Sequence, residues 1–215
     1  MITAVDIFGQ LQEKLQEGDI EGVEQLVKKA LKNDFSPEEV LKKGLIPAMD
    51  EIGEKFSSNE IFVPEVLIAA RAMNAGMEII KPRLVADGVA ARGVVVIGTV
   101  AGDLHDIGKN LVRMMLEGAG FEVIDLGTDV SAQEFVEALE ENNADILAMS
   151  ALLTTTMTAM ENVISEVEKT GLRDETYIMV GGAPVTEDFA REVGADYYAV
   201  DAAEAARGAK KAVSG

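Results

Sequence analysis

The chain has 215 residues, 48% of them hydrophobic, with no cysteine, a single histidine and a formal net charge of −19. The lack of cysteine excludes disulfides, zinc–thiolate sites, iron–sulfur clusters and thiol catalysis, and the negative charge argues against nucleic acid or an anionic membrane surface as a partner. Because no stretch approaches the roughly 18 continuous apolar residues of a membrane span and the N-terminus lacks a signal pattern, we expect a soluble cytoplasmic protein of one large or two small domains.

Residues 1–80 have the hydrophobic periodicity of helices throughout. The helix boundaries carry residue types that favour a start or an end, at Gly18, Asp19, Ser36-Pro37 and Pro64. The third start is the clearest, because Ser36 and Glu39 have the spacing of a capping box. We therefore predict four amphipathic helices with short connections, which make a small four-helix bundle.

Residues 81–92, which include Pro82 and Asp87-Gly88, have the composition of a linker. Beyond them, short apolar runs typical of strands alternate with helical stretches. The strand-like runs are 94–100, 122–125, 146–150, 177–180 and 197–200, and the helical stretches lie near 107–118, 132–141, 156–170, 186–193 and 202–212. This alternation predicts a five-stranded parallel sheet with helices on both faces, flavodoxin-like or Rossmann-like. We expect a helical domain over 1–88 and an α/β domain over 89–215.

The only histidine, His105, follows the first predicted strand in the segment Gly102-Asp103-Leu104-His105-Asp106-Ile107-Gly108. A neutral imidazole binds transition metals, and Asp103 can accept a hydrogen bond from the other ring nitrogen. The chain has no second histidine and no cysteine, so a metal bound by His105 must bring most of its own ligands, as a macrocycle does. The alternatives are a structural role for His105 and an N-cap role for Asp103 on the following helix.

Two more loops follow strands at the same predicted edge of the sheet. The loop after the third strand contains hydroxyl groups between Ser150 and Thr156, and the loop after the fourth begins with Gly181-Gly182. Ligands of open α/β sheets bind outside the carboxyl ends of the strands, and paired glycines let a bulky ligand approach the backbone. A helix cap formed by the hydroxyl groups and an ordinary tight turn at the glycines remain open. A phosphate-binding Walker loop fails on spacing.

Three motifs in this order and spacing resemble the cobalamin-binding signature: Asp103-x-His105-x-x-Gly108, Ser150-x-Leu152 and Gly181-Gly182. The helical half resembles the cap bundle that precedes the cobalamin domain of methionine synthase. Nearly the whole chain is therefore similar to the corrinoid proteins of methyltransferase systems.

The resemblance implies a cobalamin cofactor bound in the base-off, His-on form. His105 binds the cobalt through Nε2, Asp103 accepts a hydrogen bond from Nδ1, and the hydroxyl of Thr156 completes the relay. The dimethylbenzimidazole tail enters a slot beside the sheet. The residues implied to contact the cofactor are Asp103, His105, Asp106, Ile107 and Gly108 in the first loop, and Ser150, Leu152, Thr154, Thr156, Gly181 and Gly182 in the other two.

The resemblance also places Phe56, Val63 and Val66 over the methyl position of the cofactor, where apolar side chains would shield it. This lid must move when a partner approaches, so we expect a hinge at 81–92. The alternative is that these three residues are ordinary core.

The function implied is that of a methyl carrier, a non-catalytic component of a methyltransferase system. Cobalt(I) accepts a methyl group from a substrate-specific methyltransferase, and methyl-cobalt(III) donates it to a second methyltransferase that acts on a thiol or tetrahydrofolate. A reductive activator is a further implied partner. The alternatives are the small subunit of an adenosylcobalamin mutase, which generally lacks the helical cap, and a cobalamin-dependent sensor, which usually has a tryptophan that is absent here. The methyl donor stays open among methanol, methylamines, glycine betaine and aryl methyl ethers.

Overall fold

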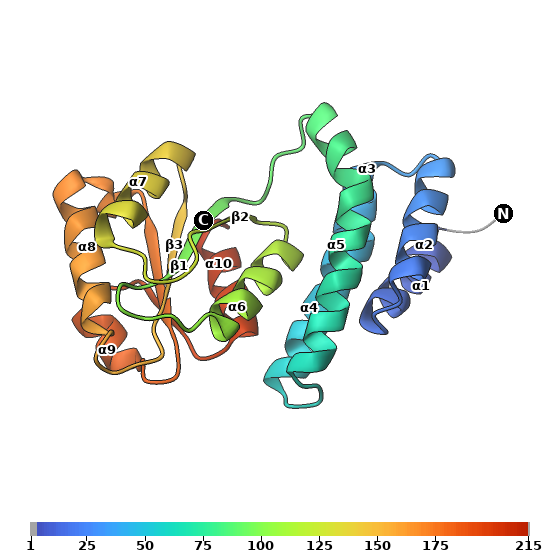
Figure 1. The fold of residues 1–215 in the computed structure, drawn as a ribbon. Coiled ribbons are helices and arrows are strands. Elements are labelled where there is room, and N and C mark those ends of the chain that lie inside the picture. The colour runs from blue at the N-terminus through green and yellow to red at the C-terminus, as the bar shows by residue number, and fades with distance from the viewer. Residues whose placement is uncertain (1–3, 215) are drawn as a thin grey trace. The chain divides into compact units, whose positions relative to one another are not determined.

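Two units make up the structure, a computed structural model that describes residues 4–214, with side chains from Ile7 onward (Figure 1). The helical unit contains the residues up to Ala90 together with Gly118–Gly120, and the α/β unit contains the rest. None of the helices among the described residues is long and apolar enough to cross a membrane.

The helical unit contains the four helical segments that the sequence predicts. The first, second and fourth are α1 (Ala4–Gln16), α2 (Ile20–Lys32) and α5 (Val63–Ala86). The third is continuous and consists of α3 (Pro37–Val40), the π-helical turn η1 (Leu41–Leu45) and α4 (Ile46–Ser57). Asp19 caps α2 by accepting a hydrogen bond from the backbone of Gly22, and Ser36 and Glu39 form the expected capping box. These caps satisfy N–H groups that a helix start leaves without partners.

The prediction of a linker over residues 81–92 is wrong for its first part, because helix α5 continues through residues 81–86. Pro82 lies inside the helix, and the end comes only at Asp87, whose N–H donates to the carbonyl of Arg83. Leu84, two residues beyond the proline, is buried. Burial of this apolar side chain favours the last helical turns and offsets the hydrogen bond that the proline removes.

The α/β unit has five parallel strands in the order β2-β1-β3-β4-β5, the flavodoxin-like order, which confirms the predicted fold class. The strands are β1 (Val94–Thr99), β2 (Glu122–Asp125), β3 (Ile146–Ser150), β4 (Tyr177–Gly181) and β5 (Tyr197–Ala199). The helices are α6 (Ile107–Gly118), α7 (Ala132–Asn142), α8 (Thr158–Thr170), η2 (Leu172–Asp174), α9 (Glu187–Glu192) and α10 (Ala202–Ala212). Figure 1 shows α6 and α10 on one face of the sheet and α7 and α8 on the other.

Strand register places the ends of three strands side by side. Thr99, the last residue of β1, pairs with Ser150 of β3, and Ser150 pairs with Gly181 of β4. The loops that follow these strands therefore leave the sheet from neighbouring positions at its carboxyl edge.

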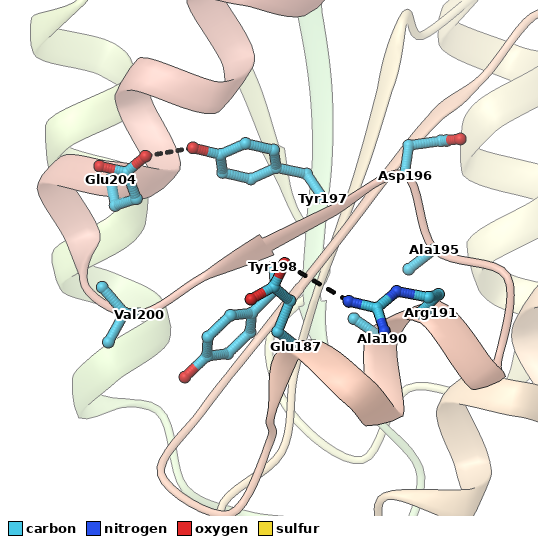
Figure 2. A pocket seen from close by; sticks show the side chains of 9 residues that line it. All are labelled: Glu187, Ala190, Arg191, Ala195, Asp196, Tyr197, Tyr198, Val200 and Glu204. Carbon is cyan, nitrogen blue, oxygen red and sulfur yellow. Dashed lines mark hydrogen bonds and ion pairs between the residues drawn. The ribbon is translucent and has the colours of Figure 1, made fainter.

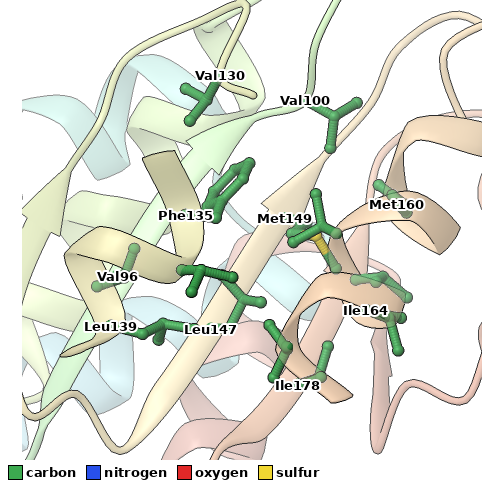
Figure 3. Packing of buried hydrophobic residues seen from close by; sticks show 14 of the residues in the cluster. Val96, Val100, Val130, Phe135, Leu139, Leu147, Met149, Met160, Ile164 and Ile178 are labelled. Carbon is green, nitrogen blue, oxygen red and sulfur yellow. The ribbon is translucent and has the colours of Figure 1, made fainter. Parts of the chain in front are cut away.

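The core under this edge is apolar and fully enclosed. Figure 3 shows Phe135 of α7 packed with Val100 and Val130, beside Met149 of β3. Side chains of this size contribute about 1.5–3 kcal/mol each when they are fully buried. The loops of the carboxyl edge therefore start next to a well-packed apolar core.

Candidate functional site

Asp103 and His105 form the centre of the loop between β1 and α6. The Nδ1 atom of His105 lies 2.7 Å from Oδ1 of Asp103, and the backbone N–H of His105 donates to the same oxygen at 3.1 Å. The histidine side chain is 51% exposed, whereas that of Asp103 is fully buried. A carboxylate accepts from Nδ1–H, so the pair favours the tautomer in which Nε2 has the free lone pair that a metal needs.

The second oxygen of Asp103 is held by the loop after β3. The backbone N–H groups of Leu152 and Leu153 donate to Oδ2 at 2.8 and 3.2 Å, and the hydroxyl of Thr156 donates at 2.8 Å. Burial by itself raises the pKa of the Asp103 carboxyl, but the hydrogen bonds from Leu152, His105 and Thr156 outweigh it and hold that pKa well below its usual range. A buried carboxylate anion thus orients the ring of His105.

The alternatives for these side chains find little support in the contacts. Asp103 accepts hydrogen bonds from His105 and from the loop after β3, and not from the backbone of α6. Helix α8 starts after Met157 without a side-chain cap, so neither Ser150 nor Thr154 caps it. Ser150 is half-buried and Thr154 is exposed.

Several large apolar side chains are exposed in the segments that follow the strands at the carboxyl edge. Large hydrophobic side chains from three loops of the carboxyl edge are exposed by 41–80%. They are Leu104 and Ile107 after β1, Leu152 and Leu153 after β3, and Val200 after β5. Of the other residues of the first motif, Asp106 accepts a hydrogen bond from the side chain of Asn110, and Gly108 is exposed in the first turn of α6.

Gly181 and Gly182 occupy positions at which a side chain would meet backbone. A Cβ atom at Gly182 would lie 1.9 Å from the carbonyl oxygen of Ala151, and the residue has a φ of +128°, which favours glycine. A Cβ at Gly181 would lie 3.0 Å from the carbonyl oxygen of Ala199. Gly182 therefore allows the loops after β3 and β4 to approach each other closely, and Gly181 allows the end of β4 to lie close to β5.

The three apolar residues expected over the methyl group belong to the helical unit. Phe56 lies near the end of α4 and is half-buried, while Val63 and Val66 lie in the first turn of α5. Val66 is fully buried and Val63 is 36% exposed. Their contact with a methyl group stays a prediction.

The sequence reasoning missed four polar side chains around the loop of His105. The hydroxyl of Thr99 donates to the carbonyl oxygen of His105 at 2.9 Å, and Asp129 accepts from the N–H of Gly102 at 2.7 Å. Lys109, 2% exposed, forms an ion pair with Asp125 at 2.6 Å. None of these residue types is distinctive by itself, and their partners lie in other segments of the chain.

No group of three or more histidine, aspartate or glutamate side chains is placed to hold a metal ion among the residues that the structure describes.

A hollow of about 490 Å³ lies along β5, between α9 and α10 (Figure 2). Tyr197 donates a hydrogen bond to Glu204 there, and burial, together with that carboxylate, raises the pKa of Tyr197 to about 12. On the other side of the strand, Arg191 pairs with Glu187. None of the nine residues that line the hollow is one of the predicted site residues.

Comparison with protein families gives two matches. A model described as a B12 binding domain matches residues 93–209, and a second model with the same description matches residues 7–81.

Similar proteins agree with these matches. The trimethylamine corrinoid protein of Methanosarcina barkeri is 40% identical over 216 residues and covers 100% of both chains. The dimethylamine corrinoid protein 1 of Methanosarcina acetivorans is 46% identical over 182 residues, which cover 84% of this chain and 85% of the relative.

Two solved structures resemble the chain over most of its length. A cobalamin-binding protein from Desulfitobacterium hafniense is 31% identical, with a TM-score of 0.81 and coverage of 95% of this chain and 98% of that one. The methanol:cobalamin methyltransferase complex MtaBC from Methanosarcina barkeri contains a chain that is 29% identical, with a TM-score of 0.87 and coverage of 99% and 81%.

Proposed function

The chain belongs to the family of B12-binding corrinoid proteins, and from this premise we propose that it carries methyl groups in a methylamine methyltransferase system. Its cofactor is a corrinoid, as the resemblance to this family implies. Relatives named for trimethylamine and dimethylamine are 40–46% identical, compared with 29% for the chain of the methanol complex. These identities favour a methylated amine as the methyl donor.

The observation that carries the proposal is the pair of Asp103 and His105. A buried carboxylate 2.7 Å from Nδ1 leaves Nε2 as the ring nitrogen for a metal. Exposed apolar side chains in the same loops, such as Leu104 and Leu152, suit a large ring that brings most of the metal ligands itself. The residues of the carboxyl edge therefore fit a corrinoid.

When bound, the corrinoid supplies a cobalt centre that accepts and releases a methyl group. His105 would bind the cobalt through Nε2, and Asp103 fixes the tautomer and the direction of the imidazole ring. The hydroxyl of Thr156 and the N–H groups after β3 keep Asp103 anionic, which keeps the proton on Nδ1.

The remaining predicted contacts have separate tasks in this proposal. Asp106, Ile107 and Gly108 would contact the corrin ring, as would Leu152 from the next loop. Ser150, Thr154, Gly181 and Gly182 form the slot for the nucleotide tail. In the helical domain, residues 1–88, the side chains of Phe56, Val63 and Val66 shield the methyl group from water.

The partners follow from the chemistry of a carrier. One methyltransferase recognises the methyl donor, and a second passes the methyl group to a thiol or to tetrahydrofolate. The match to a chain of a methyltransferase complex supports a methyltransferase as partner. A reductive activator restores the cofactor after oxidation.

Methyl transfer from a series of donors tests the proposal. The protein is loaded with hydroxocobalamin, reduced, and mixed with the methyltransferases for trimethylamine, dimethylamine, monomethylamine or methanol from Methanosarcina barkeri, each with its own donor. We expect methylation of the cofactor with at least one methylamine enzyme and slower methylation with the methanol enzyme. Methylation with the methanol enzyme alone would contradict the donor class, and a protein that does not bind hydroxocobalamin would contradict the carrier function.

A further inference from the structure

Two side chains outside the cobalamin motif fix the loop that contains Asp103 and His105. We propose that Thr99 and Asp129 are positioning residues, which hold His105 in its metal-binding conformation before a corrinoid binds. This inference rests on the proposed function, in which His105 is the metal ligand. It concerns a feature of the chain by itself, because both contacts are made within the α/β unit.

Asp129 makes two hydrogen bonds to the turn that precedes His105. Its Oδ1 accepts from the N–H of Gly102 at 2.7 Å, and its own N–H donates to the carbonyl oxygen of Asp103 at 3.0 Å. The two bonds hold the backbone on both sides of the Gly102–Asp103 peptide. Asp129 therefore sets where the carboxylate of Asp103 enters the site.

The backbone of Asp129 is itself constrained. Its φ is +58°, a left-handed conformation that residues other than glycine adopt uncommonly and that costs about 1–2 kcal/mol for most of them. Glycine would satisfy the backbone of the turn equally well but has no side-chain acceptor. Aspartate adds an acceptor for Gly102, and because the residue is exposed, burial does not explain the choice.

Thr99 holds the other end of the turn. Its side chain is fully buried at the end of β1, and its hydroxyl donates to the carbonyl oxygen of His105 at 2.9 Å. A valine would fill the same space without a donor. The hydroxyl thus links the backbone of the metal ligand directly to the sheet.

Both positioning residues are anchored to the core. The N–H of Thr99 donates to the carbonyl of Gly127, and the N–H of Val130 donates to the carbonyl of Thr99. Val100 and Val130 form a parallel bridge, and Figure 3 shows both side chains beside Phe135 in the core. The loop that contains Asp129 is therefore hydrogen-bonded to β1 both before and after that residue.

Ordering a loop costs free energy when it happens on binding, so a loop that is already ordered binds more tightly. Thr99 and Asp129 reduce this cost for a loop whose histidine is exposed by half. The Asp103–His105 pair is then formed in the protein without its cofactor.

Amide hydrogen exchange of the cofactor-free protein tests this proposal. The reporters are the N–H groups of Leu152 and Leu153, because both donate to Asp103 and are released when the loop opens. In Thr99→Val and Asp129→Gly we expect these two amides to exchange about fivefold faster, which corresponds to the loss of one hydrogen bond. Glycine tolerates the φ of residue 129, so the variant removes the acceptor without backbone strain.

Conservative variants and a core amide serve as controls. Thr99→Ser and Asp129→Asn keep the hydroxyl and the acceptor, so exchange at Leu152 and Leu153 should stay near the wild-type rate. The amide of Leu147, inside β3, should be unaffected in all four variants.

Three results would overturn the proposal: unchanged exchange at the two reporters, equal acceleration in the conservative variants, or equal acceleration at Leu147, which would indicate a general loss of stability. A wild-type protein that binds hydroxocobalamin without a bond from His105 would instead contradict the proposed function. Because the exchange measurement uses no corrinoid, the two failures are distinguishable.

Discussion

Replacing Asp103 by asparagine should reverse the tautomer of His105. The carboxylate accepts five hydrogen bonds, two on Oδ1 from His105 and three on Oδ2 from Leu152, Leu153 and Thr156. Asparagine has one acceptor oxygen and one NH₂ group. The oxygen should turn to the side with three donors, which leaves the NH₂ group facing His105.

An NH₂ group that faces Nδ1 can only donate to it. The imidazole must then place its proton on Nε2, where it blocks the atom that binds the metal. Loss of a partner that orients a metal-binding histidine typically costs about 10–100-fold in metal affinity. The variant should also lose about 2–4 kcal/mol of stability, because charge-assisted bonds become neutral ones and one backbone N–H meets a second donor.

The single histidine makes the tautomer directly measurable, since only one imidazole contributes to the ¹⁵N spectrum. At a pH where the ring is neutral, we expect the proton on Nδ1 in the wild type and on Nε2 in Asp103→Asn. Thr156→Val is the matched control, because it removes one donor to Oδ2 and leaves the bonds to His105 in place. A proton that stays on Nδ1 in the asparagine variant would refute the reasoning.

The same variant tests the pH dependence of stability. The folded protein holds the pKa of Asp103 below the unfolded value of about 3.9, so the stability that this carboxylate contributes is present above that pH and is lost as the pH falls toward the folded pKa. The difference in unfolding free energy between wild type and Asp103→Asn should be constant above about pH 5 and shrink below pH 4. Denaturation curves at a series of pH values measure it, and a difference that grows on acidification would have the wrong sign.

Two further predictions concern stability, measured by chemical denaturation. Gly182→Ala should cost at least about 3 kcal/mol, because its Cβ would collide with the carbonyl of Ala151, whereas Gly171→Ala, at a φ of +83° with open space around it, should cost only about 1 kcal/mol; equal losses would contradict the collision. Asp125→Ala should cost about 3–5 kcal/mol because it leaves the buried ammonium of Lys109 unpaired. Lys109→Met should cost less, since Asp125 is 20% exposed and keeps a backbone N–H donor, and the reverse order would refute this assignment.

Strong local signals made the α/β half predictable from the sequence. Most strands are short, largely apolar runs, and the predicted strand limits differ from the observed ones by one residue at most. The start of α3 was equally clear, because Ser36 and Glu39 form a capping box that depends only on local spacing.

Features set by tertiary packing were less accessible. The π-helical turn Leu41–Leu45 has no sequence signal that distinguishes it from an α-helix, and the sequence reasoning did not predict it. Pro82 suggested the end of a helix that in fact continues to Ala86. In both places the chain conformation depends on contacts with other helices.

The candidate site likewise has parts that the sequence predicts and parts that it does not. The Asp103–His105 hydrogen bond follows from a spacing of two residues, and the edge of the sheet follows from the strand pattern. Thr99 and Asp129 could not be found, because the hydrogen bond of Asp129 to Gly102 spans 27 residues and threonine at a strand end is common.

Cobalt(II) EPR of the protein loaded with hydroxocobalamin and then reduced tests the central claim, that His105 binds the corrinoid, most directly. The protein is prepared with ordinary and with ¹⁵N-labelled histidine, and only His105 can take up the label. We predict an axial nitrogen splitting that changes from three lines to two on labelling and is absent in His105→Ala. A splitting that does not respond to the histidine label would mean that the cofactor keeps its own base on the cobalt, and would contradict the claim.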